Sequence, residues 1–179
     1  MVCQPSWLRL GRQLTQEANQ LEADITRRVT DLAPSLLAIL GCGALTAGKL
    51  IGEAADITRF TNRDAYAMWV SVAPIPVWSA NPNRYRFNRG GNRQTNAALH
   101  RIAITQARIH PDAQAFIKRQ IETGSTKGEA LRLLKRKLAN VVYRTLHADT
   151  QTTPLAQAAC HRRNTYGPWW LSDSDNGER

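Results

Sequence analysis

The chain has 179 residues, with 24 Lys and Arg against 14 Asp and Glu, so its formal net charge is +10 at pH 7. This length is enough for one domain with a hydrophobic core. The positive charge favours polyanionic partners, nucleic acid before an anionic membrane surface. No stretch approaches the roughly 18 apolar residues that a membrane-spanning helix requires, which argues against a protein that crosses the membrane.

The cysteines argue against a disulfide framework and against zinc. The three of them are Cys3, Cys42 and Cys160, and their spacing fits neither kind of site. The first residues lack the apolar segment of a secretory signal peptide. We therefore expect a protein of the reducing cytoplasm that holds no metal or other cofactor through this chain alone.

Residues 7–32 have helical spacing with a heptad tendency. Apolar residues repeat at seven in two series, Leu14 with Leu21, and Ala18 with Ile25 and Leu32. Such a repeat predicts a coiled-coil connector helix over residues 1–33 and a homo-oligomer formed through it. An ordinary amphipathic helix that packs on its own domain fits the same pattern.

Two glycines join the next pair of predicted helices. Pro34 suits the first turn of a helix that runs to Leu40, and a second helix covers about residues 45–54. The connection, Gly41-Cys42-Gly43, resembles the turn of a helix-hairpin-helix motif, in which the second helix offers N–H groups to a phosphate. We expect Gly41 and Gly43 to contact a DNA backbone, and a plain antiparallel helix pair is the alternative.

A short helix and a hairpin are predicted in the middle of the chain. Asn62 is a candidate cap for a helix over residues 65–69. The β-prone segment that follows contains Pro74 and Pro76, so it can form only an edge strand or an extended segment. Residues 84–87 alternate Arg and aromatic side chains, which predicts a second strand with both arginines on one face.

A serine and a set of arginines share this hairpin region, and no Asp or Glu occurs from residue 65 to residue 111. Guanidinium groups match phosphate oxygens with a planar fork of donors. Ser79 in this setting is therefore a candidate nucleophile or phosphate contact, and a solvated basic loop is the alternative. The arginines expected to bind DNA are Arg84, Arg86, Arg89, Arg93 and Arg101.

The remaining segments are predicted to be helical up to about residue 148. Helices are expected over residues 94–109, over 111–122 with Ala115 and Ile121 among its apolar residues, and over 127–146. Thr126 and Glu129 form a capping box for the last of these. Its apolar stripe is Leu131, Leu134, Leu138, Val141, Val142 and Leu146, with Arg132, Arg136, Lys137 and Arg144 projecting away.

The predicted fold is thus mainly α-helical in three parts. These are the coiled-coil-like helix at residues 1–33, a DNA-binding domain at 34–148, and a disordered tail at 149–179. The domain contains the helix-hairpin-helix-like pair, one short β-hairpin and the later helices. The tail is predicted from its polar composition without helical spacing.

Four segments carry a family resemblance through their order and spacing. They are residues 39–43 (ILGCG), 72–76 (VAPIP) leading to Ser79, 86–94 (RFNRGGNRQ) and 133–138 (LLKRKL). Together they resemble the C-terminal domain of the DEDD class of bacterial insertion-sequence transposases, described as bridge-RNA-guided serine recombinases. The resemblance covers about residues 34–146.

This resemblance implies DNA transposition by a two-part active site. An N-terminal acidic domain would bind Mg²⁺, and the C-terminal domain would supply a serine that attacks a DNA phosphate; Ser79 falls on that serine. DNA is the implied partner, and a guide RNA is a further candidate. Three residues depart from the family pattern: Trp78 and Ala80 stand where Ser and Gly are usual, and Ser71 stands where Gly is common. The acidic domain has no counterpart here, so we expect a truncated transposase that is inactive alone.

Two other functions fit the same features. One is a non-enzymatic nucleic-acid-binding module built on the helix-hairpin-helix pair and the basic hairpin. The other is a basic structural protein that binds RNA. Ser79 after its proline-rich approach favours the enzyme, because a module that only binds has no need of a nucleophile.

Overall fold

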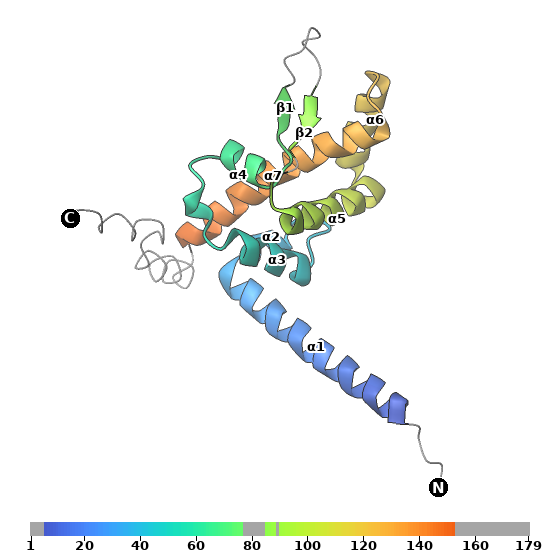
Figure 1. Cartoon of the computed structure of the whole chain (residues 1–179), viewed down its shortest axis with the longest axis vertical. Coiled ribbons are helices and arrows are strands. Elements are labelled where there is room, and N and C mark those ends of the chain that lie inside the picture. The colour runs from blue at the N-terminus through green and yellow to red at the C-terminus, as the bar shows by residue number, and fades with distance from the viewer. Residues whose placement is uncertain (1–5, 77–84, 89, 153–179) are drawn as a thin grey trace, which may run out of the picture.

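The computed structural model describes residues 6–76, 85–88 and 90–152, and this part of the chain is mainly α-helical, as predicted. The first elements are α1 (Ser6–Leu32), α2 (Pro34–Leu37), α3 (Ala44–Ala54) and the 3-10 turn η1 (Ile57–Arg59). They are followed by α4 (Arg63–Trp69), β1 (Pro74–Pro76), β2 (Tyr85–Phe87), α5 (Arg93–Ile109), α6 (Pro111–Glu122) and α7 (Lys127–Thr152). In Figure 1, α1 extends from one side of the helical body and the β1–β2 hairpin from the opposite side.

Helix α7 runs through the body and packs against α2, α4, α5 and α6. Four residues of its predicted stripe are buried: Leu134, Leu138, Val142 and Leu146. Leu131 is partly buried, whereas Val141 lies at the edge of the stripe and is exposed. Other elements complete the core with Leu36, Leu50, Tyr66, Leu99 and Ile102, all fully buried. Burial of each large apolar side chain stabilises the fold by about 1.5–3 kcal/mol.

The apolar residues of α1 divide between two environments. Val29 is buried and Ile25 packs partly against the core, near Gly48 of α3. A Cβ at Gly48 would lie 3.0 Å from Ile25 Cγ2, so the glycine allows the two helices to approach closely. Towards the N-terminal end, Leu14 and Leu21 are 56% and 63% exposed. The C-terminal end of α1 therefore packs on its own domain, and its N-terminal half carries an uncovered apolar face.

The first helix of the predicted helix-hairpin-helix pair is shorter than expected. It was predicted to reach Leu40, but α2 is a single turn that ends at Leu37. Backbone hydrogen bonds of the turn type then lead to Cys42, whose N–H donates to the Ile39 carbonyl at 2.9 Å. Helix α3 begins at Ala44, close to the predicted start.

Helix α6 has the predicted bounds. Pro111 stands in its first turn, where a missing N–H costs no hydrogen bond. The side chains that face the core are Ala113 and Phe116, whereas Ala115 and Ile121 are exposed. Ala113 and Phe116 are three residues apart and so share the face that packs against α5 and α7, whereas Ala115 and Ile121 do not share one face.

The predicted capping box starts α7. Thr126 N–H donates to Glu129 Oε2 at 2.8 Å, and Glu129 N–H donates to Thr126 Oγ1 at 3.3 Å. These hydrogen bonds to the ionised carboxylate lower the pKa of Glu129. The helix continues to Thr152, past the predicted end at Leu146 and into the segment assigned to the tail.

Candidate nucleic-acid interface

Three asparagines spaced by four, Asn88, Asn92 and Asn96, fasten the hairpin to the C-terminal end of α4; we call them the asparagine clamp. Asn88 Nδ2 donates to the Met68 carbonyl at 3.0 Å, and the Asn92 backbone N–H donates to the Trp69 carbonyl at 2.7 Å. Asn96 Nδ2 donates to the Val70 carbonyl at 2.9 Å. The end of a helix leaves its last carbonyls without partners inside the helix. The clamp uses them to position the strand that returns from the hairpin.

Asn92 also joins the hairpin to two further helices. Its side-chain oxygen accepts a hydrogen bond from Thr95 N–H at 2.8 Å and so caps α5. Its Nδ2 donates to Glu53 Oε2 of α3 at 2.7 Å. The side chain of Asn92 therefore connects α3 and α5, and its backbone N–H connects them to α4, at the foot of the hairpin.

The second glycine of the Gly90-Gly91 pair is required by close packing. A Cβ at Gly91 would collide with Ser71 Oγ and with the Trp69 carbonyl oxygen. Ser71 itself has a φ of 66°, in the left-handed region that few non-glycine residues adopt. The turn after α4 and the turn after β2 thus press against each other at the foot of the hairpin.

The hairpin itself is short and antiparallel. Pro74 pairs with Phe87, Ile75 with Arg86, and Pro76 with Tyr85. Because proline has no N–H to donate, the two prolines confine β1 to an edge position, as predicted. The segment that joins β1 to β2, with Ser79 and Arg84, lies outside the described residues, and so does Arg89.

The other predicted contact residues fall in two regions. Arg93 and Arg101 are exposed on α5, and Arg86 belongs to β2. Gly41 has a φ of 84° and faces α5, where a Cβ would lie 2.9 Å from Thr105 Cβ. Gly43 is the N-cap of α3, with no side-chain hydrogen bond to cap the helix. Close packing therefore explains Gly41 without a ligand, whereas nothing lies within 4 Å of a Cβ built at Gly43.

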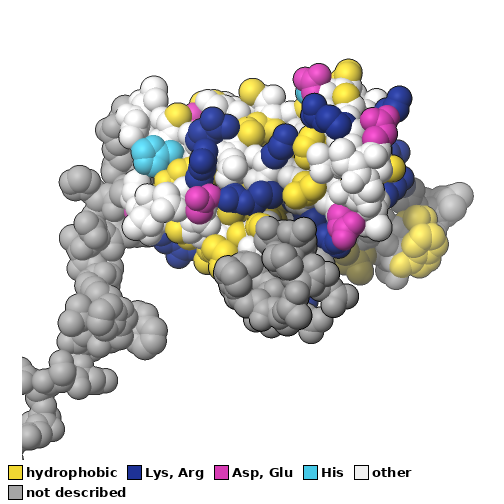
Figure 2. All heavy atoms as spheres, turned by 90° about the horizontal axis from the view of Figure 1, so that it is seen from above, with side chains coloured by type: hydrophobic (Ala, Val, Ile, Leu, Met, Phe, Trp, Pro, Cys, Tyr) yellow, Lys and Arg dark blue, Asp and Glu magenta, His cyan; other side chains and the backbone are white. Residues whose placement is uncertain are grey.

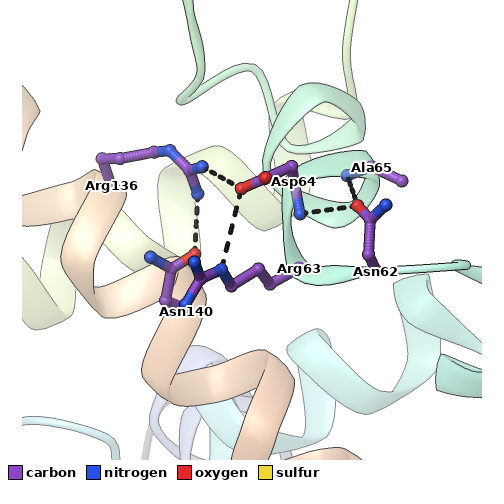
Figure 3. A network of polar contacts seen from close by, with 6 residues as sticks. All are labelled: Asn62, Arg63, Asp64, Ala65, Arg136 and Asn140. Carbon is purple, nitrogen blue, oxygen red and sulfur yellow. Dashed lines mark hydrogen bonds and ion pairs between the residues drawn. The ribbon is translucent and has the colours of Figure 1, made fainter.

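The basic side chains of α7 do not all project freely into solvent. Arg136, expected to point away, pairs with Asp64 of α4 and donates to Asn140 Oδ1 at 2.7 Å (Figure 3). Asn62 caps α4 by accepting from Ala65 N–H at 2.8 Å. Asp64, the last acidic residue before the segment 65–111 that has none, thus holds α4 against α7.

Lys135 is a residue at the foot of the hairpin that the sequence analysis did not single out. Its Nζ donates to Asn96 Oδ1 at 3.0 Å, across α5 and α7. Burial and the nearby Arg132 charge lower the pKa of Lys135. Burial and Lys135 lower the pKa of His100 on α5. The sequence spacing could have identified Lys135. It comes four residues after Leu131 and three before Leu138, so it falls on the buried face of α7.

Figure 2 looks onto the face from which the hairpin projects. Lys and Arg side chains lie at several places across it, with fewer acidic ones between them. Within the described ranges no group of three or more His, Cys, Asp or Glu could hold a metal ion. No helix in the same ranges is long and apolar enough to cross a membrane.

Comparison with known proteins adds two findings. Residues 33–118 match the model of the transposase IS116/IS110/IS902 family. The chain is also 28% identical over 138 residues to the insertion element IS110 uncharacterized 43.6 kDa protein of Streptomyces coelicolor. That alignment covers 75% of this chain but 34% of the relative, so the chain spans about a third of the relative's length. Both comparisons therefore find similarity between part of this chain and transposases of the IS116/IS110/IS902 type.

Proposed function

We propose that this chain is the DNA-binding part of an insertion-sequence transposase, and that Ser79 attacks a DNA phosphate in the intact enzyme. The carrying observation is that the segment between β1 and β2, which contains Ser79, is anchored at both ends. The Val72 N–H donates to the Ala67 carbonyl at 3.0 Å before β1, and the asparagine clamp holds the chain after β2. Anchoring on both sides restricts the positions that the chain between them can adopt, and a nucleophile must be held in a defined position to react.

The proposed step is a transesterification at phosphorus. Ser79 Oγ forms a bond to the phosphorus while the bond to one deoxyribose oxygen breaks. The serine proton leaves to a base, and the released deoxyribose oxygen takes up a proton. A serine hydroxyl is a weak nucleophile at neutral pH and needs a base or a metal. We propose that Mg²⁺ held by acidic residues outside this chain meets that need.

The proposal gives the hairpin arginines a role in charge stabilisation. Negative charge grows on the phosphate oxygens in the transition state, and guanidinium groups directed at them lower its free energy. Arg84, Arg86 and Arg89 flank the predicted nucleophile in sequence, and Arg93 begins α5 beside the clamp. Exposed Arg101 on α5 would add a contact further along the DNA backbone.

We also propose that the intact protein forms an oligomer through α1. Its N-terminal half carries Trp7, Leu10, Leu14 and Leu21, all more than half exposed. Three of them, Trp7, Leu14 and Leu21, recur at seven and share one face of the helix. A second copy of α1 would cover this face by coiled-coil packing.

A trapping experiment tests the catalytic assignment. The chain would be joined to the N-terminal part of a related transposase and given a nicked DNA substrate. We expect a covalent protein–DNA adduct that requires Mg²⁺ and is absent from Ser79→Ala. Losing a nucleophile that acts together with a metal commonly lowers the rate by several orders of magnitude.

Ser71→Ala is the matched control for that experiment. Ser71 is a partly buried serine at the foot of the same hairpin, so its removal alters the region without touching the proposed nucleophile. The adduct should survive in this variant. An adduct that persists without Ser79 would overturn the assignment. Salt-sensitive binding with no adduct in any protein would favour the alternative, a non-enzymatic binding module.

A further inference from the structure

Lys135 lies where partial burial raises the free energy of an ammonium group that has no anionic partner. It lies on α7 at the spacing of the buried stripe, and its side chain is partly buried. An ammonium group has three donors. Among the described residues, one of them is used, in the 3.0 Å hydrogen bond to Asn96 Oδ1. Removing an ammonium group from water with a single neutral acceptor is unfavourable, so the remaining donors call for a further acceptor.

The surroundings of Lys135 are positive rather than negative. Within the described part of the chain no carboxylate lies within 4 Å of its Nζ. Its electrostatic neighbours are Arg132, one turn earlier on α7, and His100 on α5. The Arg132 guanidinium pairs with the Glu129 carboxylate at 3.5 Å. A partly buried ammonium beside a second cation, Arg132, favours the binding of an anion.

We propose that Lys135 binds a phosphate of the nucleic-acid backbone at the foot of the hairpin. This inference rests on the proposed function, because it takes the same DNA as ligand. A phosphodiester supplies acceptor oxygens for the remaining Lys135 donors and negative charge beside Lys135 and Arg132. Lysine serves this purpose as a point charge, without the fork geometry of arginine.

The bond to Asn96 connects this phosphate contact to the position of the hairpin. Asn96 accepts from Lys135 with its oxygen and donates with its nitrogen to the Val70 carbonyl. A phosphate bound by Lys135 is therefore two hydrogen bonds away from the backbone that leads into β1. Hydrogen bonds in series polarise one another, so the ligand strengthens the clamp as well as neutralising the charge.

The test compares three single variants of this chain in binding to duplex DNA over a series of salt concentrations. Lys135→Gln removes the charge but keeps a polar chain of similar length. Lys135→Arg keeps the charge, and Lys137→Gln is the matched control. Lys137 lies two residues along the same helix, and its Nζ lies 4.0 Å from the centre of the Phe116 ring on the α6 side.

We expect Lys135→Gln to reduce the slope of log K against log salt by about 0.9, the contribution of one phosphate contact. Lys135→Arg and Lys137→Gln should keep the slope of the parent. An unchanged slope in Lys135→Gln overturns this inference and leaves the proposed function standing. Equal reductions of the slope in Lys135→Gln and Lys137→Gln also overturn it, because they indicate that net charge alone, and not a phosphate site at Lys135, sets the salt dependence. A parent protein with no salt dependence removes the proposed function itself.

Discussion

Two features of the structure disfavour any side chain at position 41, where the chain has Gly41. Its φ of 84° lies in the region where an L-residue pays about 1–2 kcal/mol. In addition, a Cβ there would lie 2.9 Å from Thr105 Cβ and 3.3 Å from the Ile102 carbonyl oxygen, so α5 would have to move. Gly41→Ala should therefore lower the free energy of unfolding by about 2–3 kcal/mol, measured by chemical denaturation.

Gly52→Ala is the matched control, with the opposite expected sign. Gly52 lies inside α3, and nothing is found within 4 Å of a Cβ built on it. Alanine in a helix interior is favoured over glycine by up to about 1 kcal/mol, so this variant should be slightly more stable. If Gly41→Ala were equally well tolerated, the close approach of the turn to α5 would not be a requirement of the fold.

At the residue scale, sequence spacing identifies a buried face but not the partners that meet on it. Lys135 lies on the stripe of α7, yet its partner Asn96 is 39 residues earlier on another helix. Asn92 and Glu53 are likewise 39 residues apart. Helical periodicity contains no information about such pairs, because they depend on how the helices are arranged in space. The glycines and asparagines of residues 88–92 can be read from the sequence, but their contacts with the C-terminal end of α4 cannot.

At the scale of elements, helix ends were predictable where local chemistry sets them. Pro111 and the Gly124 turn bound α6, and the Thr126–Glu129 box starts α7. The end of α7 was missed because its last turns lack apolar spacing. There the threonines bond back to the helix, as Thr150 Oγ1 does to the Leu146 carbonyl at 2.8 Å. Adding residues to an existing helix is easier than starting one, so the helix extends beyond its apolar stripe.

Helix α1 gives a prediction at the same scale. Replacing Leu14 and Leu21 together by Glu should abolish self-association and leave the helical content, measured by circular dichroism, unchanged. Both leucines are exposed, whereas the contacts that attach α1 to the body involve Ile25 and Val29. Like charges at the seam of a coiled coil oppose pairing. Sedimentation at several protein concentrations measures the effect.

The control for α1 places the same charges on the opposite side of the helix. Gln16 and Gln20 are exposed and lie away from the face of Leu14 and Leu21. The double variant Gln16→Glu with Gln20→Glu should associate like the parent. A parent that stays monomeric at high concentration would contradict the proposed role of α1.

For the whole molecule, the positive charge predicts DNA binding that weakens steeply with salt. If Arg84, Arg86, Arg89 and Arg93 each contact a phosphate, the slope of log K against log salt should be roughly −3 to −4 from these four residues. Changing Arg86 and Arg89 together to Ala should flatten it by about two units. Anisotropy titrations with an arbitrary duplex suffice, since phosphate contacts carry no sequence information.

If Arg84, Arg86, Arg89, Arg93 and Lys135 each contact a different phosphate, their effects on the slope should be separable but cumulative. Substitutions that share no partner add their contributions in most proteins. An unchanged slope after loss of both Arg86 and Arg89 would move the DNA contact away from the hairpin. Exposed Arg101 and Arg108 on α5 would then be the next residues to change.

The N-terminal half of α1, which does not contact the described part of the body, would set both the distance and the angle about the helix axis between the body and an attached domain. The helix has 27 residues, and about 28 Å of its axis precedes Ile25, where it meets the body. The position of a domain fused to the start of α1 would depend on that length and on the angle at which the helix leaves the body. Seven added residues would turn the fused domain by only about 20°, whereas five would point it to the far side. The length of this spacer, counted in residues, therefore decides which side of an attached domain faces the hairpin.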